Sequence, residues 1–150
     1  MSRSLPVITT LLAVLVLGVA VESRAGDVIV IVHAANSVPT LSLEDVRRMY
    51  QATAKFWPSG HRVVLLLPPP EGAAMDALVR NLLAVPDSSA VAGFYLRAIF
   101  QGRLSAMPAR TSGTGDAVAK VARHKGAIAL ANRSELLPDV SVRRIEVPGL

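Results

Sequence analysis

Apolar residues along the chain form several continuous runs that predict β-strands. Residues 27–33 (DVIVIVH) are a β-branched run without polar alternation, and residues 62–67 (RVVLLL) form a second such run. Runs of this kind are typical of strands covered on both faces, as in a parallel sheet. Residues 127–131 (AIALA) predict a third strand. Residues 140–147 (VSVRRIEV) alternate at first, as an exposed edge strand does.

Between these runs, apolar residues recur at the spacing of amphipathic helices. The first predicted helix follows Ser42 and carries Glu44 and Asp45 in its first turn, which is the pattern of a capped start. The predicted helices are residues 43–50, 74–82, 90–100 and 117–123. Strands and helices interleave along the chain. The sequence therefore predicts an α/β domain with a small mixed or parallel sheet flanked by helices.

The amino-terminal segment has the pattern of an export signal. Arg3 supplies a positive start, residues 11–21 (LLAVLVLGVAV) are unbroken apolar, and residues 23–25 (SRA) offer small residues for cleavage. An uncleaved anchor is the alternative, and it would be the only contact with a membrane. We expect a signal peptide over residues 1–25, one domain over residues 26–150, and a periplasmic or secreted location.

Composition excludes several classes of function. The chain has no cysteine, which rules out disulfides, thiolate metal sites and a cysteine nucleophile. Without residues 1–25, 14 basic and 10 acidic residues leave a net charge of +4. The basic residues are scattered, and nucleic-acid binding requires a clustered basic face with stacking aromatic residues. We therefore expect no nucleic-acid partner.

No catalytic or metal-binding motif is present in the sequence. The histidines His33, His61 and His124 lie far apart, and none has a carboxylate or second histidine at metal-ligand spacing. The Gly-x-Ser-x-Gly, Walker and Gly-x-Gly-x-x-Gly patterns do not occur. The sequence therefore predicts a non-enzymatic protein without a metal or cofactor.

A stretch of hydroxyl and glycine residues precedes the last predicted helix. Its candidate anion-binding residues are Arg110, Thr111, Ser112, Gly113 and Thr114. Amides at a helix amino terminus attract anions, and an arginine can hold two oxygens. Alternatively, Thr114 or Asp116 caps this helix without any ligand. Asn36 and Ser37, in the first strand–helix loop near the expected cleft, are a similar pair of candidates in a turn.

Four parts of the chain carry a resemblance to a known family. They are residues 41–50 (LSLEDVRRMY), 56–60 (FWPSG), 94–97 with 100–102 (FYLR and FQG), and 125–130 (KGAIAL). In this order they resemble the phosphate-type substrate-binding proteins of ABC importers, and more closely the short exported proteins with such a domain. The resemblance covers residues 28 to about 147. It implies a single lobe of a type II periplasmic-binding-protein-like fold, since full binding proteins close two lobes around a ligand.

The resemblance also implies a ligand and a place for it. In the family, the loop after the second strand holds phosphate with an arginine and a Ser-Gly-Thr at a helix amino terminus. The corresponding residues 69–75 here are PPEGAAM, which lack the arginine and the hydroxyls. The implied residues are Glu71, matching an acid that the family places nearby, and Gly72 and Ala73, whose amides remain at the helix start.

Two functions follow from the resemblance. The first is an exported, non-enzymatic solute-binding domain with a weak or altered site for inorganic phosphate or a similar oxyanion, working with an ABC permease or another envelope protein. The second is a degenerate binding lobe that acts as a protein-interaction module in the envelope.

Overall fold

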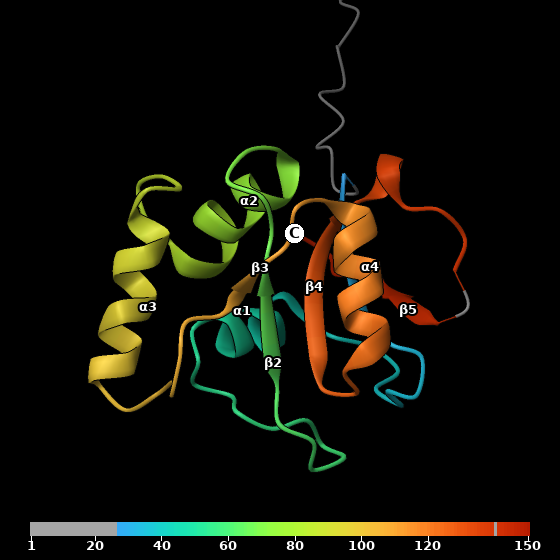
Figure 1. The fold of residues 1–150 in the computed structure, drawn as a ribbon, viewed down its shortest axis with the longest axis horizontal. Helices are drawn as coiled ribbons and strands as arrows, with labels where there is room; N and C mark the ends of the chain where they lie inside the picture. Colours follow the sequence, from blue (N-terminus) through green and yellow to red (C-terminus); the bar gives the residue numbers. More distant parts are fainter. Residues whose placement is uncertain (1–26, 140) are drawn as a thin grey trace, which may run out of the picture.

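A five-stranded mixed sheet forms the centre of the protein (Figure 1). The structure is a computed structural model that describes residues 27–139 and 141–150, so the predicted signal peptide lies outside the described residues. The strands lie in the order β3-β2-β4-β1-β5. Their bounds are β1 Val28–His33, β2 Val64–Leu67, β3 Ala109–Arg110, β4 Ala127–Asn132 and β5 Val142–Ile145.

Strand direction divides the sheet into two parts. β2 runs parallel to β3 and β4, whereas β1 runs antiparallel to both of its neighbours, β4 and β5. The predicted first strand is confirmed, but it does not lie among parallel strands. Its continuous apolar run reflects cover on both faces, which helices provide whatever the direction of the neighbours. β5 lies at an edge of the sheet, as its alternation predicts.

The four predicted helices lie close to their expected positions, and a short 3-10 helix was not predicted. They are α1 Leu43–Tyr50, α2 Ala73–Ala77 with the π-helix η1 Leu78–Leu83, α3 Ala90–Phe100, α4 Thr114–Arg123 and the 3-10 helix η2 Arg133–Glu135. α1 has the predicted cap: the Ser42 hydroxyl accepts from the Asp45 amide at 3.0 Å, and the Asp45 carboxylate accepts from the Ser42 amide at 3.0 Å. α4 begins three residues earlier than predicted, because the Gly113 carbonyl accepts from the Ala117 amide.

Helices cover both faces of the sheet. β1 presents Val30 to a core formed with α1, α2, η1 and α3, and it presents Ile31 to a smaller core under α4. Ala117 and Val121 are the buried residues of α4 in that smaller core. This two-sided cover explains why β1 is apolar throughout. None of the helices in residues 27–139 and 141–150 has the length and apolar composition of a membrane span.

Two buried tyrosines tie the helices to the sheet. The Tyr50 hydroxyl donates to the Leu66 carbonyl of β2 at 3.1 Å, and the Tyr95 hydroxyl donates to the Tyr50 carbonyl at 2.9 Å. Burial raises the pKa of both phenols, that of Tyr50 well above its ordinary value. α1 and α3 are thus held to the strand that leads into the candidate site.

Candidate functional site

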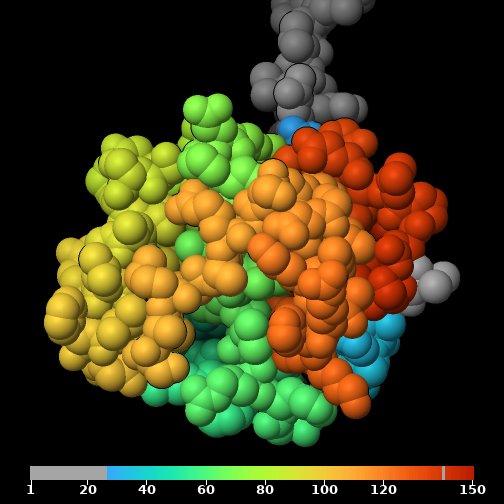
Figure 2. Space-filling view, viewed as in Figure 1, coloured from blue at the N-terminus to red at the C-terminus, as the bar shows by residue number. Residues whose placement is uncertain are grey.

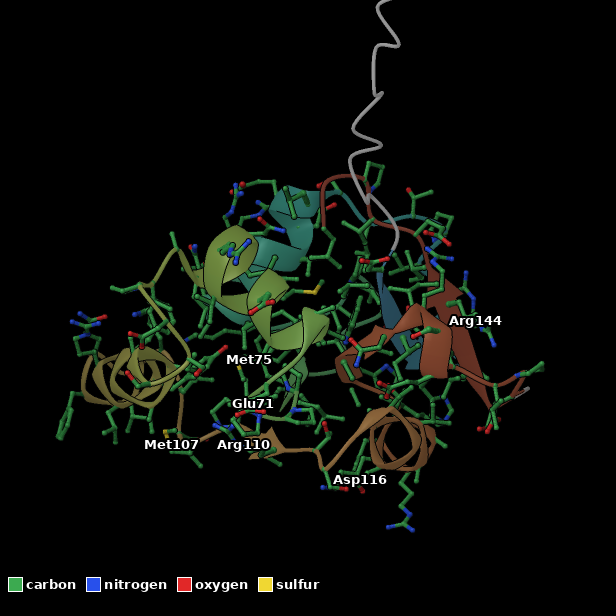
Figure 3. The ribbon with its side chains drawn as sticks, turned by 90° about the horizontal axis from the view of Figure 1, so that it is seen from above. Glu71, Met75, Met107, Arg110, Asp116 and Arg144 are labelled. Atoms are coloured by element: carbon green, nitrogen blue, oxygen red, sulfur yellow. The ribbon has the colours of Figure 1, made fainter. Side chains whose placement is uncertain are left out.

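The carboxyl ends of three parallel strands meet at one edge of the sheet. β2 leads to α2, β3 leads to α4, and β4 ends at Asn132, so both helix starts open onto this edge (Figures 1 and 3). In open α/β sheets, ligands bind beyond the carboxyl ends of the strands. The topology therefore brings Glu71–Ala73 and Arg110–Thr114 to the same edge.

Asn132 joins the starts of the two helices. Its side-chain Oδ1 accepts from the Ala74 amide in the first turn of α2 at 3.1 Å, and its backbone amide donates to the Thr114 hydroxyl of α4 at 3.3 Å. Its Nδ2 donates to Glu135 at 3.2 Å. Asn132 is not among the residues predicted from the sequence, although a polar residue directly after the apolar run 127–131 is a usable signal.

The two threonines expected to contact an anion are buried and already bonded. The Thr111 hydroxyl donates to the Leu67 carbonyl at 3.0 Å, and the Thr111 amide donates to the same carbonyl at 2.8 Å. Thr114 accepts from Asn132, as described above. Thr111 therefore holds β3 against β2, and Ser112 is the hydroxyl residue of this stretch that remains exposed.

Asp116 occupies part of the α4 start. Its carboxylate accepts from Lys120 Nζ at 2.9 Å and from the Ser112 amide at 2.9 Å. The bond from Lys120, followed by the bond from the Ser112 amide, lowers the pKa of Asp116. Neither Thr114 nor Asp116 caps the amides of the helix itself, because Gly113 is the N-cap residue and α4 has no side-chain cap. The first-turn amides of α4 therefore stay available.

Arg110 and Glu71 are exposed side chains at this edge (Figure 3). Arg110 ends β3 opposite Leu67, and Glu71 lies in the loop that follows β2. Arg110 forms no ion pair with any residue that the structure describes. Arg110 is thus a cation at this edge without an acidic partner among the described residues. The carboxylates of Glu71 and Asp116 lie at the same edge and carry the opposite charge.

A shallow pocket of about 460 Å³ lies between the α2 start and η2. Its lining is Asp27, Gly72, Ala73, Asn132, Arg133, Ser134 and Glu135. Gly72 has φ 107°, a left-handed conformation that favours glycine, and it places the α2 start beside Asn132. The acidic residues Asp27 and Glu135 outnumber the basic Arg133 in this lining, which disfavours an anion.

Asn36 and Ser37 do not lie with the other candidate residues, so the expectation that they lie near the cleft is wrong. β1 runs antiparallel to β4, which puts the end of β1 and the following loop at the opposite edge of the sheet. There the Asn36 Oδ1 accepts from the Val38 amide at 3.0 Å, and Arg143 donates to the Val38 carbonyl at 2.9 Å. These hydrogen bonds stabilise the turn that contains Asn36 and Ser37.

The three histidines lie at a strand end or in loops. His33 ends β1, His61 lies in the turn before β2, and His124 follows α4. Across residues 27–139 and 141–150, no three histidine, cysteine, aspartate or glutamate side chains are placed to hold a metal ion.

Two solved structures share this fold. One is a phosphate ABC transporter substrate-binding protein with bound phosphate from Clostridium perfringens, with a TM-score of 0.59 and 18% identity over 81% of this chain and 44% of that one. The other is an ABC-type phosphate transport receptor from Vibrio cholerae, with a TM-score of 0.60 and 13% identity over 81% of this chain and 46% of that one. No family model and no curated protein matches the chain.

These matches cover only part of each similar protein. The chain covers less than half the length of each of the two larger proteins. At this level of identity the likeness concerns the fold alone. The mixed sheet with helices on both faces is that of a single lobe of a periplasmic-binding-protein fold.

Proposed function

We propose that this protein is an exported, non-enzymatic solute-binding lobe that takes a tetrahedral oxyanion, with inorganic phosphate as the first candidate. One observation carries the proposal: the amino termini of α2 and α4 open onto one edge, joined through Asn132, with Arg110 beside them. The shared fold supports it, since the two similar structures are named for phosphate transport.

The charges at this edge favour a weak site. A helix amino terminus acts as about half a positive charge, and a guanidinium can hold two oxygens of one anion. The Asp116 carboxylate at the α4 start and the exposed Glu71 reduce this attraction. The anion would contact the first-turn amides of α4, Ser112 and Arg110 on one side, and the amides of Gly72 and Ala73 on the other. A single lobe also leaves one side of the ligand open.

The proposal includes export of the protein and a partner in the cell envelope. Residues 1–25 would direct export, which places the mature protein in the periplasm or outside the cell. An ABC permease or another envelope protein would receive the ligand or cover the open side of the site. The second candidate function is a lobe that serves only as an interaction module. It is favoured by the Thr111 and Thr114 hydroxyls, which the fold itself uses.

Calorimetric titration of the purified protein with phosphate, sulfate and methylphosphonate tests the proposal. We expect weak binding of phosphate and at least about a tenfold loss of affinity in the double variant Arg110→Ala/Ser112→Ala, because a bidentate contact and a hydroxyl are removed. Arg80→Ala is the matched control, since Arg80 is exposed on η1. The absence of heat with every oxyanion would reject the anion site and favour the interaction module.

A further inference from the structure

A second pocket, of about 310 Å³, opens beside the sheet at the start of β2. β3 pairs only with Leu66 and Leu67, so the preceding residues of β2 have no strand on that side. The segment that leads from α3 into β3 passes over this gap. Figure 2 shows the surface hollowed between this yellow-to-orange segment and the green β2.

The pocket is apolar on its floor and walls. The apolar lining comes from the end of α1 and the turn after it (Met49, Ala52), from β2 (Val64, Leu65) and from the segment before β3 (Leu104, Met107). Val64 is 38% exposed and Met107 is 42% exposed, so both remain accessible to a ligand. Apolar side chains left open around a cavity are typical of ligand or partner sites.

Basic side chains also line this pocket. Lys55, Arg62 and Arg103 contribute to it, and within the described part of the chain no acidic residue does. None of the three forms an ion pair with a described residue. Arg103 is held by the Gln101 side chain at 2.8 Å and by the Gln51 carbonyl. Lys55 and Arg62 are exposed and have no acidic partner among the described residues.

The contacts of Lys55 and Arg62 leave their charge free for a ligand. Lys55 Nζ donates to the Gly102 carbonyl at 3.4 Å, a long bond, and the Arg62 guanidinium lies 5.6 Å from the centre of the Phe56 ring. A ring face and a carbonyl attract a cation without neutralising it. A ligand with a negative head group is therefore attracted electrostatically to Lys55 and Arg62, whereas an uncharged ligand is not.

We propose that this pocket binds an anionic amphiphile, with its apolar chain or ring in the cavity and its carboxylate held by Lys55 and Arg62. A volume of about 310 Å³ lies at the small end of ligand pockets, which suits one short chain. An added peptide strand fits less well. The Val63 amide, just before β2, already donates to the Lys55 carbonyl at 2.9 Å. At the carboxyl end of β2, Leu66 and Leu67 are paired with β3. The backbone of β2 is thus occupied on this side at both ends of the gap.

Titration of the purified protein with decanoate and with decanol tests this proposal. Binding is followed by calorimetry and by NMR shifts of the Val64, Leu65 and Met107 methyl groups. We expect decanoate to bind at least about tenfold more tightly than decanol, because the head group gains charge-assisted hydrogen bonds. Lys55→Gln/Arg62→Gln should remove this preference, whereas Arg80→Gln on η1 should retain it.

A second variant tests the cavity independently of charge. Ala106 lines the pocket and is exposed, so Ala106→Phe can fill the opening without disturbing the core. It should weaken the binding of both compounds. Equal affinity for decanoate and decanol, binding that persists in both pocket variants, or no binding below the concentration at which decanoate aggregates would each overturn the proposal. Excess phosphate should leave decanoate binding unchanged, since the oxyanion edge is a separate site.

Discussion

At the scale of single residues, Gly126 shows a constraint that no local pattern reveals. An added Cβ there would lie 1.9 Å from the Arg62 carbonyl oxygen. The backbone just before β2 passes this close to Gly126. The Gly126 carbonyl also accepts from the Trp57 indole at 2.8 Å and from the Val64 amide at 2.9 Å. Glycine is needed here for close approach of two backbone segments.

We expect Gly126→Ala to lower the free energy of unfolding by about 3 kcal/mol, the upper part of the usual range for overpacking. Gly93→Ala is the matched control, since no atom lies within 4 Å of an ideal Cβ there. Gly93 lies inside α3, so alanine should stabilise the protein by about 0.5–1 kcal/mol. Urea unfolding followed by Trp57 fluorescence measures both changes, and equal stability of the two variants would contradict this reasoning.

Asp116 gives a residue-scale prediction for the anion site. Asp116→Asn should raise phosphate affinity several-fold, because it removes a repelling carboxylate from the α4 start while an amide oxygen can still accept from Ser112. Calorimetry with phosphate measures the change. Asp87→Asn, in the loop before α3, is the control and should leave affinity as it is. A lower affinity in Asp116→Asn would place the anion elsewhere.

At the scale of elements, α1 shows how far local sequence determines a helix. The pattern Ser42-Leu43-Glu44-Asp45 predicts its start, and the reciprocal bonds between Ser42 and Asp45 confirm it. A cap is a contact between near neighbours, so sequence is sufficient. β3 has only two residues, Ala109 and Arg110, which carry no periodicity. This strand exists because Thr111 and its neighbours bond to β2, a contact between distant segments.

We expect Ser42→Ala to lower the free energy of unfolding by about 1 kcal/mol, the usual value of an N-cap. The bonds from the Ser42 amide and hydroxyl are the largest causes of the lowered pKa of Asp45, with Arg48 adding to them. This variant loses the hydroxyl but keeps the amide, so the pKa of Asp45 should rise part of the way toward its ordinary value, as NMR titration can measure. Ser37→Ala, in an exposed turn, is the control. An unchanged Asp45 pKa would argue against the cap.

At the scale of the whole molecule, ionisable groups define a range of pH in which the fold is stable. Hydrogen bonds from Ser42, Ser89, Lys120, Ser141 and Arg133 lower the pKa of one carboxyl each; these carboxyls are Asp45, Asp87, Asp116, Asp139 and Glu146. Their contribution is complete above the unfolded pKa and is lost as pH falls through the lower folded value. Tyr50 and Tyr95 have raised pKa values, so their contribution is lost as pH rises above the ordinary phenol value of 10.0.

We therefore expect the melting temperature to fall at both ends of a scan from about pH 2 to pH 11, and to vary little in between. Circular dichroism measures the transition, and repeating the scan in high salt separates direct hydrogen bonds from long-range charge effects, which salt screens. Tyr95→Phe should reduce the loss on the alkaline side. A melting temperature that stays constant down to pH 2 would contradict the role of the carboxyls.

The α/β class, the three buried strands predicted at residues 27–33, 62–67 and 127–131, and the cap of α1 follow from the sequence alone. These features depend on near neighbours and on the period of apolar residues, which one chain displays directly. The strand directions, and with them the loops that share an edge, depend on contacts between distant segments. Antiparallel β1 separates Asn36 from the other candidates, and parallel β2, β3 and β4 bring Arg110 to Glu71 and make Asn132 the link between two helix starts. The amphiphile pocket likewise arises where β3 is too short to cover β2. These strand pairings and side-chain bonds join distant segments of the chain. Their free energy depends on tertiary packing, which a local sequence pattern does not show.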